Sequence, residues 1–109
     1  MKTGRMKLSE AIKKGAEIAP VHMQRNTVRP DNNGKLAACA LGCAYLGLGD
    51  LPEHFFEYPY VDTSEAIRRV STELGLSAEF LCKVISKNDR TLNPMSRQQI
   101  IKWLESIGE

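Results

Sequence analysis

Apolar positions recur at three- and four-residue spacing along most of this chain, which is the period of an amphipathic α-helix. Stop signals interrupt the pattern, because Pro20, Gly47, Gly75 and Gly108 each suit the end of a helix. The pattern predicts five helices, at about residues 9–19, 35–46, 63–74, 78–87 and 97–106. A chain of 109 residues has the usual length of one domain. We therefore predict a compact all-α fold, with residues 1–109 in a single helical domain.

Polar residues stand at the predicted helix starts. Ser9, Asp62, Ser77 and Ser96 each offer a side-chain oxygen to the N–H groups of a first turn, which have no partner within the helix. After Asp62 and Ser96, a Glu or Gln three positions later completes the spacing of a capping box. The helices at 63–74 and 97–106 therefore have the best-defined starts.

The predicted helix at 35–46 is apolar nearly all round and rich in small side chains, a pattern typical of a buried central helix. The three later helices each present an apolar stripe that suits packing against it. We predict a core built from these four helices, comprising Leu41, Cys43, Val70, Leu81, Ile85, Ile100 and Leu104.

Three cysteines, Cys39, Cys43 and Cys82, lie within apolar helical patterns. This favours buried, reduced thiols and a cytoplasmic protein. Cys39 and Cys43 are spaced to meet one metal ion, but a structural zinc takes four ligands, so we expect no metal and no cofactor. We expect no leader peptide, because no apolar stretch follows the basic N-terminus. The longest uncharged apolar run, 36–48, is shorter than the roughly 20 residues of a membrane span.

Charge is distributed unevenly along the chain. Residues 1–35 carry eight bases against three acids, a net +5, whereas residues 36–109 carry seven bases against ten acids, a net −3. A basic first third suits phosphate or an acidic partner, although a solvated face is the simpler interpretation. Within the polar stretch 20–34, the segments 21–23 and 27–28 suit a short extended pair.

Residues 49–61 form an aromatic connector that holds four of the seven Phe, Tyr and Trp side chains. Pro52 and Pro59 argue against regular structure there. We expect a loop that covers the core as a lid, anchored by its rings, with an exposed stacking surface as the alternative. The candidate protein-contacting residues are the four rings and two bases of the preceding loop: Phe55, Phe56, Tyr58, Tyr60, Arg25 and Arg29.

Residues 62–88 predict two amphipathic helices joined by a tight turn at 74–77. This layout resembles the helix-turn-helix of phage repressors and Cro-like proteins. The resemblance implies that the helix at 78–87 is a recognition helix in the major groove of DNA. It would bring Ser77, Glu79 and Lys83 toward the bases, and Lys87 and Arg90 toward phosphates. However, Glu79 brings negative charge to that groove, and the helix lacks arginine, the commonest base reader.

Catalytic patterns are sparse. A catalytic nucleophile needs an adjacent base and a group that orients it. The two histidines, His22 and His54, lie in predicted loops with no such motif around them, and the glycines lack the spacing of a phosphate loop. We therefore predict no enzymatic activity.

Three short patterns together resemble a set of small, uncharacterised bacterial and phage-type helical proteins. The patterns are KLSEAI at 7–12 with GA at 15–16, CALG at 39–42 with AYLG at 44–47, and ND at 88–89 with SRQQI at 96–100 and WLE at 103–105. The resemblance implies an intracellular helical domain and assigns no site residues.

These observations together predict a small, non-enzymatic regulatory or binding protein of a bacterium or phage. Its partner is expected to be another protein, and no membrane is expected to take part. A helix-turn-helix regulator that binds DNA is the alternative.

Overall fold

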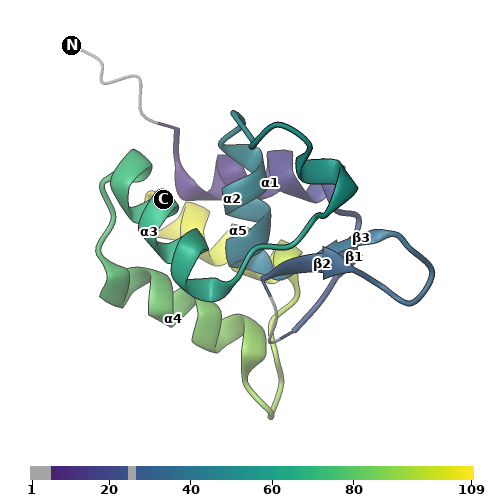
Figure 1. The fold of residues 1–109 in the computed structure, drawn as a ribbon. Coiled ribbons are helices and arrows are strands. Elements are labelled where there is room, and N and C mark those ends of the chain that lie inside the picture. Colours follow the sequence, from purple (N-terminus) through teal and green to yellow (C-terminus); the bar gives the residue numbers. More distant parts are fainter. Residues whose placement is uncertain (1–5, 25–26) are drawn as a thin grey trace.

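The computed structural model describes residues 6–24 and 27–109. Helix α2 (Ala40–Gly47) lies at the centre of the domain, with the other helices and a small sheet around it (Figure 1). The surrounding helices are α1 (Leu8–Ile18), α3 (Thr63–Leu74), α4 (Ala78–Asp89) and α5 (Arg97–Ser106), with a 3-10 turn, η1 (Phe55–Glu57). The strands are β1 (Val21–His22), β2 (Val28–Pro30) and β3 (Leu36–Ala38).

A three-stranded mixed sheet replaces part of the predicted helix and loop, so the all-α prediction is wrong. The strand order is β1-β3-β2, with β3 parallel to β1 and antiparallel to β2. Residues 36–38 therefore form the middle strand rather than a first helical turn, and α2 begins only at Ala40. Helix propensity is a weak preference, and pairing on both edges of β3 overrides it. The segments at 21–22 and 28–30 are extended, but they pair through β3 and not with each other.

All eight residues of α2 are buried, which confirms a central helix. Helices α1 and α2 cross so closely that the backbone of one lies against the backbone of the other. A Cβ added at Gly15 would lie 1.7 Å from the carbonyl oxygen of Cys43, and one at Gly47 would lie 1.9 Å from that of Ala11. In the described part of the chain, no helix is long and apolar enough to cross a membrane.

The three later helices follow the sequence predictions closely. Asp62, Ser77 and Ser96 each accept a hydrogen bond from a backbone N–H in the first turn of the helix they cap. Gly75 ends α3 in the left-handed conformation, with φ of 67°, which glycine adopts without strain. Helix α4 continues to Asp89, two residues beyond its predicted end. The predicted helix–turn–helix pair is therefore present as α3 and α4.

The start of α1 differs from the prediction. Lys7 occupies the N-cap position and Ser9 lies buried in the first turn, so the predicted Ser9 cap is wrong. The backbone N–H of Ser9 donates instead to the carbonyl oxygen of Glu109 at 2.7 Å. N–H groups in the first turn of a helix need a partner from outside it, and here the last residue of the chain supplies one.

The predicted core is confirmed except at one position. Leu41, Cys43, Val70, Leu81, Ile100 and Leu104 are all 1% exposed or less. Ile85 is only partly buried and packs against this core from the side of α4, so its assignment to the buried core is wrong. The remaining inward positions of α4 are Leu81, Val84 and Asn88.

Candidate functional site

The connector between α2 and α3 exposes most of its aromatic side chains. Phe56, Tyr58 and Tyr60 are 61%, 88% and 61% exposed, and only Phe55 is buried. The predicted lid is therefore wrong, because a single ring anchors the segment while the others face solvent. Tyr58 and Tyr60 line a shallow hollow of about 440 Å³ with three further residues. We call this hollow the aromatic patch, and it consists of Pro30, Glu57, Tyr58, Pro59 and Tyr60.

The backbone on both sides of the aromatic patch is held in place. On one side, Phe55 is buried in the core and its carbonyl oxygen accepts the N–H of Tyr58 at 3.1 Å. On the other side, Val61 and Val28 exchange two backbone hydrogen bonds, at 3.1 and 3.3 Å, which dock the connector onto β2. The exposed rings are thus carried on an ordered backbone. A surface fixed before binding loses less conformational entropy when it meets a partner.

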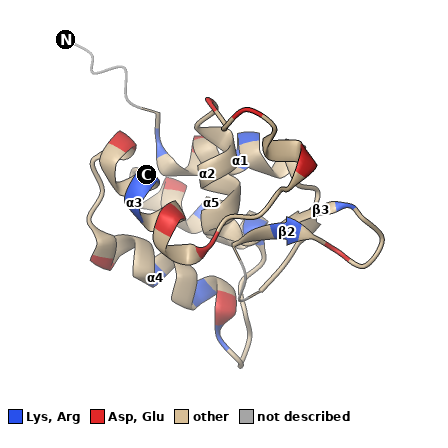
Figure 2. Cartoon of the chain, viewed as in Figure 1, with Lys and Arg blue, Asp and Glu red and all other residues tan. Residues whose placement is uncertain are grey.

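The charge around the aromatic patch is acidic. Residues 48–62 contain four acids, no lysine and no arginine. Figure 2 shows acidic and no basic positions along the segment that joins α2 to α3. Glu57 lies in the patch itself and its carboxylate pairs with His54, and both side chains are 70% exposed. The patch is therefore an apolar surface with an acidic border.

Two basic residues, Arg25 and Arg29, were predicted to contact a protein partner together with these rings. Arg29 is exposed on β2, but it lines a separate hollow of about 200 Å³ with His22 and Asp31. It borders the patch only through its neighbour Pro30. Arg25 lies outside the described residues. The structure therefore brings Tyr58 and Tyr60 together and leaves Arg29 beside them.

The turn before α4 is tightly organised. The hydroxyl of Ser71 donates to the carbonyl oxygen of Leu76 at 2.6 Å, and the hydroxyl oxygen of Ser77 accepts the N–H of Phe80 at 3.1 Å. The residues proposed to contact DNA lie on the outer side of α4. Ser77, Glu79, Lys83 and Arg90 are exposed, and Lys87 is half-buried. Helix α5 thus leaves the start of α4 accessible.

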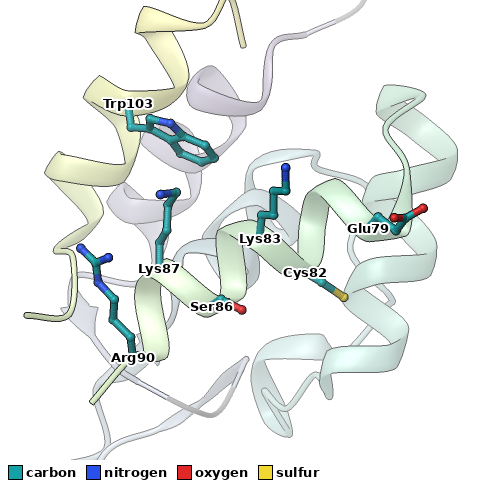
Figure 3. Close-up of a pocket in the computed structure, with 7 residues that line it drawn as sticks. All are labelled: Glu79, Cys82, Lys83, Ser86, Lys87, Arg90 and Trp103. Carbon is teal, nitrogen blue, oxygen red and sulfur yellow. The ribbon is translucent and has the colours of Figure 1, made fainter. Parts of the chain in front are cut away.

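A groove of about 610 Å³ runs between the outer side of α4 and Trp103 of α5. In Figure 3, Lys83, Lys87 and Arg90 extend toward the side on which Trp103 projects, whereas Cys82 and Ser86 point away from it. The Lys87 ammonium lies 4.5 Å from the centre of the indole ring, a cation–π contact. We call this feature the basic groove, lined by Glu79, Cys82, Lys83, Ser86, Lys87, Arg90 and Trp103.

Trp103 was not among the predicted site residues. It is held by Phe80 of α4, whose ring stacks on the indole with centroids 6.0 Å apart and planes 22° apart. Both residues lie at partly buried positions on the edges of their helices. Amphipathic spacing places each of them between the apolar and polar faces, but it does not show that the two edges meet. Their contact depends on how α4 and α5 pack.

The three cysteines are free, and two of them are buried. Burial raises the pKa of the Cys39 thiol to about 11, although its sulfur accepts the N–H of Gly42. Burial also raises the pKa of the Cys43 thiol, against the opposing effect of the Arg97 guanidinium, which donates to this sulfur at 3.1 Å. Cys82 is exposed, so its predicted burial is wrong. It follows Leu81 by one position, on the outer side of α4.

This difference in burial gives a prediction for thiol labelling. With a disulfide reagent at pH 8, we expect Cys82 to react quickly, and Cys39 and Cys43 to react only after unfolding, because thiolate is the reactive form. The rate at which the reagent releases its chromophore measures the reactivity of each thiol. A Cys82→Ser variant is expected to lose the fast phase alone. Three thiols reacting at one rate in the folded protein would contradict the buried positions of Cys39 and Cys43.

Within residues 6–24 and 27–109, no three His, Cys, Asp or Glu side chains form a group suited to hold a metal ion. His22 instead bonds to Asn88, with Nε2 and Oδ1 2.9 Å apart, and His54 pairs with its neighbours Glu53 and Glu57.

Comparisons with known proteins found no family model that matches the chain, no similar curated protein and no similar solved structure. The resemblance to small bacterial and phage-type proteins stays a prediction. The aromatic patch and the basic groove are therefore the features that point to a function.

Proposed function

We propose that this protein is a non-enzymatic, cytoplasmic regulatory protein that acts by binding another protein at the aromatic patch. The exposure of Tyr58 and Tyr60, at 88% and 61% on an ordered backbone, is the observation that carries the proposal. Exposed apolar surface is unfavourable in water, and contiguous patches of it mark interaction sites. Tyrosine is enriched among the residues that contribute most to binding, since its ring is large and rigid and its hydroxyl can bond at the rim.

The acidic border of the patch indicates the chemistry of the partner. Glu57 lies in the hollow, and the connector around it carries acids without any lysine or arginine. Charges at the rim of an interface steer association and exclude partners of like charge. The partner proposed here therefore presents an apolar projection flanked by basic side chains. Free, buried thiols at Cys39 and Cys43 support a reducing compartment.

A capture experiment with a matched control tests this function. The wild-type protein, a Tyr58→Ser/Tyr60→Ser variant and a Leu92→Ser variant are used as bait in a nuclease-treated lysate of the source cells. Leu92 is 80% exposed and is not among the residues that line the patch, so its replacement removes exposed apolar surface without changing a patch residue. We expect one protein to be retained by the wild type and by Leu92→Ser, and to be lost from the double tyrosine variant.

The retained protein is then purified and its affinity measured by calorimetry. A central tyrosine commonly contributes 2 kcal/mol or more, so we expect the double variant to bind at least about thirtyfold more weakly. Raising the salt concentration is expected to weaken binding through the acidic border. Equal affinity of the wild type and the double variant, or capture that depends on nucleic acid, would contradict the proposed function.

A further inference from the structure

The basic groove differs from the aromatic patch in charge and in volume, which is about 610 Å³ against 440 Å³. We infer that it is a second binding site, which takes single-stranded nucleic acid. This inference goes beyond the proposed protein contact and uses none of the patch residues. Three observations support it: a row of basic side chains along α4 and directly after it, an indole beside that row that stacks against Phe80, and an open hollow between them.

The row of basic side chains complements the negative charge of a nucleic-acid backbone. Lys83 and Lys87 lie four residues apart on one side of α4, and Arg90 follows directly after the helix with its side chain extended toward the same side (Figure 3). Seven residues of helix span roughly 10 Å, which is longer than the spacing between neighbouring phosphates of one strand. Arg90 is oriented by a hydrogen bond from its Nε to the carbonyl oxygen of Asn93 at 2.8 Å. These cations therefore suit more than one phosphate of the same strand.

The indole beside this row suits a nucleobase. Proteins that bind single strands combine a positive groove with aromatic rings on which bases stack. Trp103 is fixed on one side by Phe80, and the Lys87 ammonium lies 4.5 Å from its ring centre. A base that stacks on the indole would displace Lys87 toward a phosphate, which exchanges one favourable contact of the ammonium for another. The ring and the cation are thus close enough to bind adjoining parts of one nucleotide.

The indole beside the open hollow favours a single strand over a duplex. A recognition helix must protrude to enter the major groove, which is about 12 Å wide. Here Trp103 projects from α5 alongside α4. The lysines of α4 therefore lie beside the indole and not on an isolated, protruding helix (Figure 3). In addition, Glu79 stands at the N-terminal end of α4, where helix-turn-helix proteins contact base edges. A flexible strand can lie in such a groove with its bases turned toward Trp103.

The sequence provides a direct probe for this site, because Trp103 is the single tryptophan of the chain. Its fluorescence is titrated with a ten-residue oligothymidine and with a ten-base-pair duplex at equal salt. We expect the single strand to quench the emission and to bind more tightly than the duplex. With three phosphate contacts, the logarithm of the affinity is expected to fall with the logarithm of salt concentration with a slope of about −2.

Three variants separate binding in the basic groove from attraction by general surface charge. Lys83→Gln/Lys87→Gln is expected to weaken binding at least tenfold and to flatten the salt slope toward about −1, since two phosphate contacts are lost. Lys14→Gln/Lys35→Gln removes the same charge from exposed positions on α1 and the β2–β3 turn, and is expected to change affinity less than threefold. Trp103→Leu, followed by anisotropy of a labelled strand, is expected to lose tenfold or more through stacking.

The outcomes are distinct from those of the protein-binding test. The Tyr58→Ser/Tyr60→Ser variant is expected to keep full oligonucleotide affinity, with folding of every variant checked by circular dichroism. Duplex binding as tight as single-strand binding would overturn the inference in favour of a helix-turn-helix role. Absence of quenching, or an equal loss in the Lys14→Gln/Lys35→Gln control, would overturn it as well.

Discussion

A Gly15→Ala substitution is expected to destabilise the protein by at least about 3 kcal/mol, although alanine is the better helix former by about 1 kcal/mol. The new Cβ would lie 1.7 Å from the Cys43 carbonyl oxygen, 2.4 Å from its carbonyl carbon and 2.6 Å from its Cα. All three atoms belong to the backbone of α2, so no side-chain rotation relieves the overlap. Helices α1 and α2 would have to separate, which opens the most extensive helix contact of the fold.

Urea unfolding followed by circular dichroism measures this loss. Lys14→Ala is the matched control, because it introduces the same residue one position earlier on an exposed site of α1, and we expect a change within about 0.5 kcal/mol. Gly47→Ala tests the same contact from α2, since its Cβ would lie 1.9 Å from the Ala11 carbonyl oxygen. If Gly15→Ala were as stable as the wild type, the two helices could not be in backbone contact as described.

An Asn88→Ala substitution is expected to lower the free energy of unfolding by about 3–5 kcal/mol, because the Asn88 amide links three parts of the fold. Asn88 is 0% exposed. Its Oδ1 accepts the Ala40 N–H at 3.0 Å and bonds to Nε2 of His22 at 2.9 Å. Its Nδ2 donates to the Met23 carbonyl oxygen at 3.3 Å and to Oδ1 of Asp89 at 2.7 Å. Because Nδ2 is the donor, Oδ1 is the acceptor and His22 carries its proton on Nε2.

Alanine at this position would remove the acceptor of the Ala40 N–H, a buried group at the start of α2. A buried polar group left without a partner costs about 1–3 kcal/mol. Here the Ala40 N–H, His22 Nε2 and the Met23 carbonyl oxygen would all lose their bond to the Asn88 amide. Calorimetric unfolding measures the total, and amide hydrogen exchange at Ala40 measures the local effect. We expect exchange at Ala40 to become much faster. Asn33→Ala, in the exposed β2–β3 turn, serves as the control. If Asn88→Ala were as stable as Asn33→Ala, the hydrogen bonds of the Asn88 amide would contribute little to stability.

Local signals predicted the last three helices well, because their caps are encoded within four residues. Ser96 and Gln99 form the predicted capping box at the start of α5, and Asp62 caps α3 as predicted. The predicted capping box at Asp62 is incomplete, because the Glu65 carboxylate pairs with Arg68 instead. The sheet was missed for the opposite reason. Strand β3 pairs with partners 6 to 16 residues earlier in the chain, and nothing within residues 36–38 distinguishes an apolar strand from an apolar helix.

The candidate surfaces were predicted only in part. The sequence identified the aromatic connector but not which ring anchors it, since Phe55 and Phe56 are chemically identical and only the first is buried. The bases of α4 were found from helical spacing. Their association with Trp103 depends on the packing of α5, which no local pattern specifies. The burial of Asn88 likewise depends on the placement of β1 next to α4.

Site-specific photocrosslinking tests the proposed protein contact most directly. A benzophenone side chain is introduced in place of Tyr58 in one variant and of Leu92 in another, two positions that are 88% and 80% exposed. After irradiation in source cells, the position-58 variant is expected to form one discrete protein adduct that survives nuclease, and the position-92 variant is expected to form none. The same adduct from both positions, or an adduct at position 58 that nuclease removes, would contradict a protein-binding role for the aromatic patch.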